Sequence, residues 1–328
     1  MRVVAPCRAD LAGGTLDIWP IGLLHPGSLT VNMAIPVEVE LLVDLDGEPD
    51  VVLHTATNGE VRRLGPSDAL VDLTAAIGFA VVPRGGVRVV VCGQAPFRSG
   101  IGGSSSYGIA LVRALTELVG TVPPEERMVA LVRDCEARIL GCPTGEQDHW
   151  AAVRGGVVAV HLEPGGNRVE TLTVDSEWLS DRATVFFSGI RHHSGMVNWQ
   201  VIRRRLDGHA ETIEAFDQIA AAARDCRDGL AAQDETAVAS AIRREWKARR
   251  RLAPDVSPLE LNELAGVAAA SGASAVKGCG AGGGGSILVW HPPGARTGIV
   301  TALEAAAEDG RVLATGAVSD GVRLIPVS

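Results

Sequence analysis

Apolar and polar positions in the first half of the chain alternate in short runs and then recur with helical spacing. Runs rich in β-branched residues predict strands at residues 37–45, 87–92 and 155–163. Residues 104–119 predict a helix, because apolar side chains recur along one stripe after capping serines and before Gly120. A second predicted helix follows Pro123 and ends near Gly141.

The second half of the chain has a different pattern, in which one strand is followed by a long helical stretch. The expected elements are a strand over 183–187, helices through 197–252 and over 258–271, a glycine-rich turn, a strand over 286–290, a helix near 297–308 and a final strand near 311–326. A strand-rich block followed by a helix-rich block predicts an α+β protein of two domains. We place these domains at residues 1–175 and 176–328.

The chain has 328 residues, of which 46% are apolar, so two domains can each bury a core. No apolar run approaches the roughly 20 residues of a membrane helix, and the first residues lack the pattern of a signal peptide. We therefore expect a cytoplasmic protein whose six scattered cysteines are free thiols. A formal charge of −9 argues against nucleic acid as the main partner, but not against a small anionic ligand.

Lys247 and Lys277 are the only lysines among the 30 basic residues, and neither lies in the G-K-[ST] sequence of a Walker A loop. The loop at residues 98–106 offers another way to bind phosphate. Its glycines let backbone N–H groups approach a ligand, and the helix beginning at Ser104 adds the positive end of its dipole. Serine oxygens there can also bind phosphate or Mg²⁺. A tight turn with an ordinary serine cap accounts for the same residues equally well.

Residues 278–285 contain six glycines and include the letters G-x-G-x-x-G. A dinucleotide-binding loop needs a strand before it and a helix after it. The pattern here instead predicts a helix before the loop and the strand 286–290 after it. Six glycines are too many for a plain turn, because each adds to the backbone entropy lost on folding, so we expect a loop that packs against a ligand or another backbone.

Carboxylates are prominent in two further segments. Asp148 directly follows a turn, where such a residue is most often solvated or caps a helix. Glu136 lies at the margin of the apolar face of the preceding helix, and by itself it is interpreted as a surface charge. Residues 8–17 combine an arginine, two carboxylates and a glycine pair, which by themselves indicate only a first strand that runs into a loop.

Taken together and in this order, the segments resemble the GHMP kinase superfamily, named for galactokinase, homoserine kinase, mevalonate kinase and phosphomevalonate kinase. Residues 8–17 resemble its N-terminal substrate motif, residues 96–106 (PFRSGIGGSSS) its phosphate loop, and residues 277–285 (KGCGAGGGG) its C-terminal glycine motif. Within the superfamily, residues 145–156 and 186–194 are most similar to segments of heptose 7-phosphate kinases and of the kinase domain of L-fucokinase.

The chain departs from these patterns at four positions. Leu16 is an additional residue before Asp17, and Gly103 stands where a serine or threonine is usual. Glu146 replaces a lysine, and His149 replaces a glutamine. The departures leave the phosphate loop and Asp148 in place, so they concern the selection of the sugar.

The resemblance implies an N-terminal ribosomal protein S5-like domain, a C-terminal ferredoxin-like domain, and ATP and Mg²⁺ as cofactors. Asp148 is implied to be the catalytic base, and Arg8 the arginine that pairs with it and steadies the transferring phosphoryl group. Ser104 and Glu136 are implied to share the Mg²⁺ ion. The residues implied to bind ATP are Gly100, Ile101, Gly102, Gly103, Ser104, Ser105, Ser106, Gly280, Gly282 and Gly283. Those implied to bind the substrate are Gly13, Gly14, Asp17, Gln147 and Arg191.

The expected function is an ATP-dependent kinase for the anomeric (1-) hydroxyl of a sugar or sugar phosphate, with a heptose 7-phosphate as the first candidate. The alternatives are a neutral hexose kinase of the fucose or galactose type, a GHMP kinase for a non-sugar alcohol, and a non-catalytic sensor of nucleotide and sugar. We expect a small-molecule substrate, no nucleic-acid or membrane partner, and a monomer or homodimer. Arg191, His192 and His193 suit a substrate phosphate, although a structural ion pair for Arg191 is an equal alternative.

Overall fold

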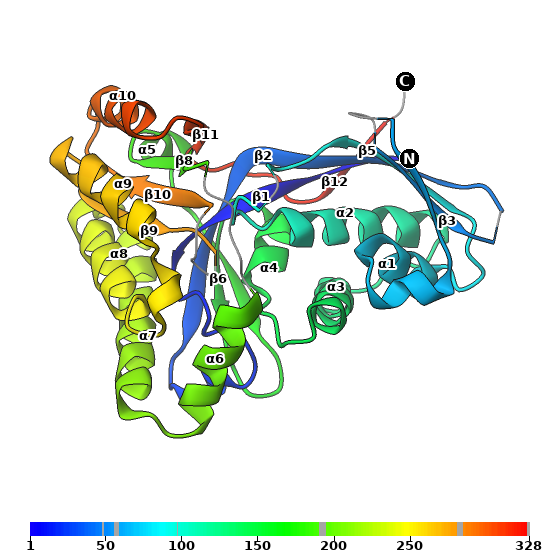
Figure 1. Ribbon diagram of the computed structural model, residues 1–328, viewed down its shortest axis with the longest axis horizontal. Helices are drawn as coiled ribbons and strands as arrows, with labels where there is room; N and C mark the ends of the chain where they lie inside the picture. The colour runs from blue at the N-terminus through cyan, green and yellow to red at the C-terminus, as the bar shows by residue number, and fades with distance from the viewer. Residues whose placement is uncertain (48, 56–58, 97, 190–194, 281–284, 327–328) are drawn as a thin grey trace.

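The structure, a computed structural model, describes residues 1–47, 49–55, 59–96, 98–189, 195–280 and 285–326. Within these residues the chain forms two β-sheets, which long helices connect (Figure 1). The strands of the larger sheet are β1 (Arg2–Ala12), β2 (Leu29–Leu45), β3 (Val51–Thr55), β4 (Val61–Leu64), β5 (Val87–Gly93), β6 (Val157–His161), β7 (Arg168–Leu172) and β12 (Arg323–Ile325). Their order is β12-β1-β2-β5-β3-β4, and β6 pairs with both β2 and β7.

Four helices lie together along one side of the larger sheet (Figure 1). They are α1 (Leu73–Val81), α2 (Gly103–Leu118), α3 (Glu125–Leu140) and α4 (Gln147–Arg154). The main apolar core includes residues of these helices and of the sheet. Ile109, Val112 and Leu115 of α2 are fully buried in it, which confirms the helical stripe expected between residues 104 and 119. Burying each such side chain contributes about 1.5–3 kcal/mol relative to exposing it.

The smaller sheet has the order β11-β8-β10-β9, and all its strands are antiparallel. Its strands are β8 (Ala183–Phe187), β9 (Ala275–Gly278), β10 (Ser286–Trp290) and β11 (Arg311–Thr315). The helices of this half are α5 (Ser176–Ser180), α6 (Gly195–Leu206), α7 (Ala210–Ala231), α8 (Glu235–Arg249), α9 (Leu259–Ala270) and α10 (Arg296–Ala306). Short 3₁₀ helices cover Ile21–Leu24, Pro66–Leu70 and Pro254–Val256.

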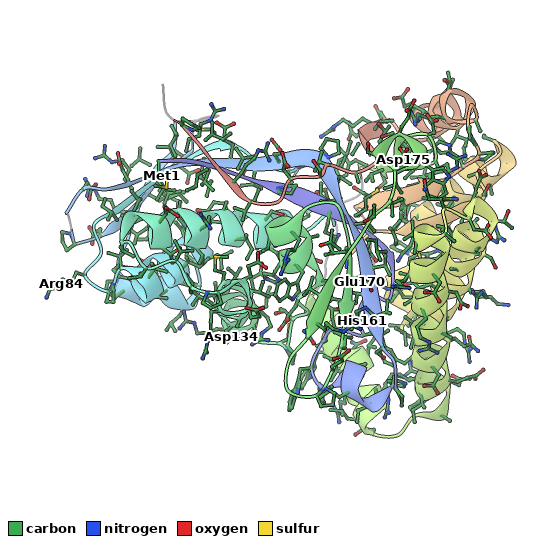
Figure 2. All side chains as sticks on the ribbon, turned by 180° about the vertical axis from the view of Figure 1, so that it is seen from behind. Met1, Arg84, Asp134, His161, Glu170 and Asp175 are labelled. Atoms are coloured by element: carbon green, nitrogen blue, oxygen red, sulfur yellow. The ribbon has the colours of Figure 1, made fainter. Side chains whose placement is uncertain are left out.

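Helices α7 and α8 pack against each other and against strands of both sheets. An ion-pair network adds to this contact: Glu170 of β7 accepts hydrogen bonds from His161 of β6 and from Arg227 of α7. Figure 2 shows His161 and Glu170 side by side on their hairpin. No helix among the described residues is long and apolar enough to cross a membrane.

The mixed helix and sheet content confirms the predicted α+β class, but three elements differ from the prediction. Strand β2 begins at Leu29, well before the predicted start at residue 37. Its first seven residues are all buried, so no alternation of polar and apolar residues indicated a strand there. The final strand is two strands: after β11 the chain turns at Gly316, which has φ +66° and abuts Ser180, and β12 then pairs with β1. The domain limits at residues 175 and 176, between β7 and α5, stay a prediction.

The third difference concerns the glycine-rich loop. The expectation that a helix precedes this loop is wrong, because the short strand β9 leads directly into it and pairs with β10 after it. The loop therefore joins two antiparallel strands. No helix opens at its end, so a dinucleotide fingerprint stays excluded on context.

Candidate active site

The described part of the phosphate loop, residues 98–106, is fixed to strand β1 by two hydrogen bonds. The Arg8 backbone N–H donates to the Ile101 carbonyl at 2.9 Å. The Ser106 hydroxyl, which is fully buried, donates to the Pro6 carbonyl at 2.8 Å. The Ser106 side chain therefore anchors the loop to the sheet.

Two glycines let this loop approach its neighbours closely. Gly102 has φ +75°, and a β-carbon there would lie 3.2 Å from the Asp148 carboxylate. A β-carbon at Gly103 would lie 2.9 Å from the Ala95 side chain, which explains why the usual serine or threonine is missing at this position. The first-turn N–H groups of α2 have no partners within the helix, so they are suited to an anion beside Asp148.

Arg8 and Asp148 form a two-pronged ion pair at this point. Arg8 Nε and Nη2 donate to the two Asp148 oxygens, each at 2.7 Å, and Arg8 Nη1 donates to the Gly100 carbonyl at 2.6 Å. Burial by itself lowers the pKa of Arg8, but the Asp148 and Asp10 carboxylates outweigh burial and raise it. The Arg8 side chain is 3% exposed and that of Asp148 is 23% exposed, so the carboxylate can reach a ligand.

Glu136 lies beneath the start of α2 and is not a surface charge. It accepts hydrogen bonds from Ser104 Oγ at 2.8 Å and Ser105 Oγ at 3.1 Å, and His149 Nε2 lies 3.0 Å from its carboxylate. Burial by itself raises the pKa of Glu136, but His149 and the serines outweigh it and lower the pKa. The glutamine-to-histidine departure at residue 149 thus places an imidazole against this carboxylate.

Ser104 and Glu136 offer hard oxygen donors of the kind that Mg²⁺ prefers. In the part of the chain that the structure describes, no cluster of three or more His, Cys, Asp or Glu side chains could hold a metal alone. Mg²⁺ in nucleotide sites usually takes one or two protein oxygens, and substrate phosphates and water complete its shell. The two side chains, joined at 2.8 Å beside the phosphate loop, fit such an ion.

Asp17 caps the start of α4. Its carboxylate accepts hydrogen bonds from the backbone N–H groups of Glu146 at 2.7 Å and Gln147 at 2.9 Å. Gly145 leaves room for it, because a β-carbon there would lie 1.9 Å from the Asp17 oxygen. Burial raises the pKa of Asp17 to about 6, against the opposing effect of these hydrogen bonds.

The raised pKa of Asp17 predicts a pH-dependent effect on stability. A carboxyl with a pKa near 3.8 when unfolded and about 6 when folded stabilises the fold below pH 3.8, and this contribution is lost as the pH rises through 6. Through this group, the free energy of unfolding of the wild type is roughly 3 kcal/mol lower above pH 7 than below pH 3.8. Asparagine does not titrate, so we expect the stability of Asp17→Asn, measured relative to the wild type, to be higher at pH 7.5 than at pH 5. Urea unfolding at both pH values tests this, with exposed Asp181→Asn as the control; equal differences at the two pH values would contradict it.

The other residues of the N-terminal motif are explained by packing. A β-carbon at Gly13 would lie 2.2 Å from the Leu29 carbonyl oxygen, and one at Gly14 would lie 2.4 Å from Arg249 Nη1. The additional residue Leu16 is fully buried in an apolar cluster with residues of α6, α7 and α8. These contacts show why the turn needs two glycines and a leucine; the predicted substrate role of Gly13 and Gly14 stays a prediction.

A group of four buried charges beside this turn was missed by the sequence analysis. Lys277 Nζ lies 2.9 Å from Asp10 and 3.1 Å from Glu245, and Arg249 Nη1 lies 3.1 Å from Asp10 and 3.4 Å from Glu245. All four side chains are at most 1% exposed. Burial by itself raises the pKa of Asp10, but Lys277 and Arg249 outweigh it and hold the pKa well below its usual range. We call these residues the charge cluster.

A signal for the charge cluster is present in the sequence of α8. Glu245 and Arg249 continue, at helical spacing, the buried stripe that Val238 and Ile242 begin. Two opposite charges on the apolar stripe of a helix indicate a buried pair. The surrounding exposed arginines make the segment look like a solvated charged helix, and they hid that signal.

The glycine-rich loop lies against the phosphate loop. A β-carbon at Gly280 would lie 2.8 Å from the Gly100 carbonyl oxygen, and one at Gly285 would lie 2.6 Å from that of Ser99. The predicted packing of this loop against another backbone is thus confirmed at both ends. Gly282, Gly283 and Arg191, together with His192 and His193, lie outside the described residues, so their predicted roles stay predictions.

Comparisons with known proteins agree with this geometry. Residues 61–156 match the family model described as the GHMP kinases N terminal domain. A Campylobacter jejuni protein named D-glycero-alpha-D-manno-heptose 7-phosphate kinase is 22% identical, and the alignment covers 98% of each chain. A solved D-glycero-D-manno-heptose 1-phosphate kinase from Bacteriodes thetaiotaomicron superposes with a TM-score of 0.76 at 21% identity, covering 100% of this chain and 99% of that one. Galactokinase from Lactococcus lactis, complexed with galactose, superposes with a TM-score of 0.79 at 14% identity, with 98% and 94% covered.

The domain match and the whole-chain superpositions confirm the resemblance to the GHMP kinases. The chain carries a GHMP kinase N-terminal domain, and its full length has the GHMP kinase fold.

Proposed function

We propose that this protein is a sugar kinase that transfers phosphate from ATP to the anomeric hydroxyl of a sugar or sugar phosphate. The observation that carries the proposal is the Arg8–Asp148 pair, held beside the phosphate loop by the Gly100 carbonyl. Phosphoryl transfer depends mostly on positioning and charge neutralisation, with one group that takes the proton of the attacking hydroxyl. Asp148 is the partly exposed carboxylate of this pair, which suits it to that role.

The remaining groups are arranged around the same point. The N-terminus of α2 would hold phosphate oxygens, and Arg8 would keep the Asp148 carboxylate in place. Ser104 and Glu136 would hold Mg²⁺, which supplies charge neutralisation of the phosphates when bound. Gln147 Oε1 is buried and has no hydrogen-bond partner among the described residues, so a substrate hydroxyl would satisfy it.

The metal assignment predicts a changed Mg²⁺ requirement. Ser104→Ala and Glu136→Ala should each raise the Mg²⁺ concentration needed for half-maximal activity, because each removes one protein oxygen from the same ion. Titrating Mg²⁺ at saturating ATP measures this shift. An unchanged Mg²⁺ dependence in either variant would remove that residue from the metal site.

A heptose 7-phosphate is the first substrate to test. The C. jejuni relative, aligned over nearly its full length, is named as a kinase for that sugar phosphate. Arg191, His192 and His193 suit a substrate phosphate by their charge and hydrogen-bond donors.

A neutral hexose is the second candidate, because four of the five charged residues that line a cleft of about 710 Å³ beside Asp17 are carboxylates. They are Asp17, Glu126, Glu146 and Glu163. Arg133 is the one cation among the described lining residues, and it already forms an ion pair with Glu146. These carboxylates favour the hydroxyl groups of a sugar, which can donate hydrogen bonds to them, and they repel a phosphate group.

Product analysis decides between these candidates. The protein is incubated with ATP, Mg²⁺ and either a heptose 7-phosphate or galactose, fucose or mannose. A phosphate–carbon coupling at C1, seen by NMR, supports the proposal, whereas phosphate on another carbon or on none of the sugars refutes it. Arg191→Ala should raise KM for the sugar phosphate far more than for a neutral sugar if Arg191 binds the substrate phosphate. The cytoplasmic location and the monomeric or dimeric state stay predictions.

A further inference from the structure

The charge cluster touches the backbone of the glycine-rich loop at one residue, Gly280. Asp10 Oδ1 accepts the Gly280 N–H at 2.7 Å, and Arg249 Nη2 donates to the Gly280 carbonyl at 2.6 Å. Both backbone groups of Gly280 are therefore fixed by charged side chains. The charges of the cluster would balance without these two contacts to the loop, so the contacts indicate a role beyond charge balance.

Gly280 is also the residue at which the glycine-rich loop meets the phosphate loop. It has φ +71° and leaves no room for a side chain against the Gly100 carbonyl. That carbonyl accepts the hydrogen bond from Arg8, which in turn holds Asp148. A continuous set of contacts thus leads from Arg249 through Gly280 and Gly100 to the proposed base.

Arg249 has a second set of contacts, with the turn of the N-terminal motif. Its Nη2 lies 3.2 Å from Thr15 Oγ1, and its guanidinium fills the space beside Gly14. Thr15 has φ +78°, a conformation that a β-branched residue rarely adopts without support from its surroundings. Asp17, which caps α4, follows two residues later.

We propose that Arg249 is a positioning residue of the kinase site, which holds the glycine-rich loop against the phosphate loop and supports the turn at Thr15. Arg249 is 1% exposed and therefore acts through Gly280 and Thr15 without touching a substrate. This proposal rests on the proposed function for its effect on turnover, but its effects on ATP binding and on the Gly280 amide do not require that a sugar be phosphorylated. Glu245 assists by pairing with Arg249 from one turn earlier on α8.

Arg249→Lys tests the proposal while keeping the positive charge. A lysine has one ammonium group, so it cannot reach Asp10, Thr15 and the Gly280 carbonyl together as the guanidinium fork does. We expect kcat to fall about 10–100-fold, because small displacements of aligned groups have effects of this size. We also expect about tenfold weaker ATP binding, at roughly 1.4 kcal/mol per tenfold, and faster hydrogen exchange at the Gly280 amide.

Arg250→Lys is the matched control, since Arg250 is the next residue on the same segment and is exposed. It should behave as the wild type in all three measurements. If Arg249→Lys keeps wild-type turnover, ATP affinity and Gly280 exchange, the proposal is wrong. If the wild type phosphorylates no sugar, the proposed function fails, while ATP affinity and Gly280 exchange still decide the role of Arg249.

A second pair of variants separates positioning from folding. Arg249→Met leaves two carboxylates against one lysine in a buried site and should lower the unfolding midpoint, whereas Glu245→Gln with Arg249→Met restores charge balance. We expect the double variant to recover the unfolding midpoint but to keep the low kcat. Recovery of turnover together with stability would show that the cluster acts only through its charge balance, and would overturn the proposal.

Discussion

Asp148→Asn should lower kcat by about 10²–10⁴, the usual contribution of a positioned general base. The carboxylate accepts two hydrogen bonds from Arg8, and an asparagine would turn its NH₂ group toward a guanidinium that can only donate. The variant therefore loses both the proton acceptor and half of the Arg8 contact. ATP binding should remain, because the first-turn N–H groups of α2 do not depend on Asp148.

The measurement combines steady-state turnover with ATP titration of the same sample. Asp225→Asn serves as the control, because Asp225 forms an exposed ion pair with Arg244, away from the site. Turnover of Asp148→Asn within a few fold of the wild type would exclude Asp148 as the base.

Arg8→Lys should have the second-largest effect, with kcat about 10²–10³-fold lower, comparable to the loss of one preorganised donor at a developing charge. Arg8 donates to both Asp148 oxygens and to Gly100 from one planar group, and a lysine has no such fork. The phosphate loop would lose its tie to the base, so KM for ATP should rise as well.

Arg2→Lys is the matched control, on the same strand but in a half-exposed pair with Glu40. Its kinetics should equal those of the wild type. If Arg8→Lys changes the unfolding midpoint but not kcat, Arg8 acts in folding alone and has no part in the proposed mechanism.

The loops of the site were the part best predicted from the sequence. The glycines and serines before a predicted helix indicated either a phosphate site or a tight turn at residues 98–106, and the order of the motifs along the chain indicated that Arg8, Asp148 and Glu136 belong to one site. The predicted serine cap is wrong, because Gly102 is the N-cap of α2 and no side chain caps that end. The structure brings these three side chains together around the start of α2. Their catalytic and metal-binding roles stay predictions that the variants above test.

Long-range contacts were not predictable in the same way. The charge cluster joins Asp10, Glu245, Arg249 and Lys277 from three distant segments, and no local pattern states which buried charges will meet. The return of β12 to β1 was missed for a similar reason, since three residues carry too little periodicity to indicate a partner strand. Strand β9 was missed because its four residues directly precede the glycines.

The central claim, that this protein transfers phosphate from ATP to a sugar, is tested most directly by sugar-dependent ADP release. The wild type and Asp148→Asn are incubated with ATP and Mg²⁺, with and without a heptose 7-phosphate, fucose, galactose or mannose. We expect ADP release by the wild type to require one of these sugars, and the variant to bind ATP but release almost none. ADP release that is the same with and without every sugar, or equal in the two proteins, would contradict the account.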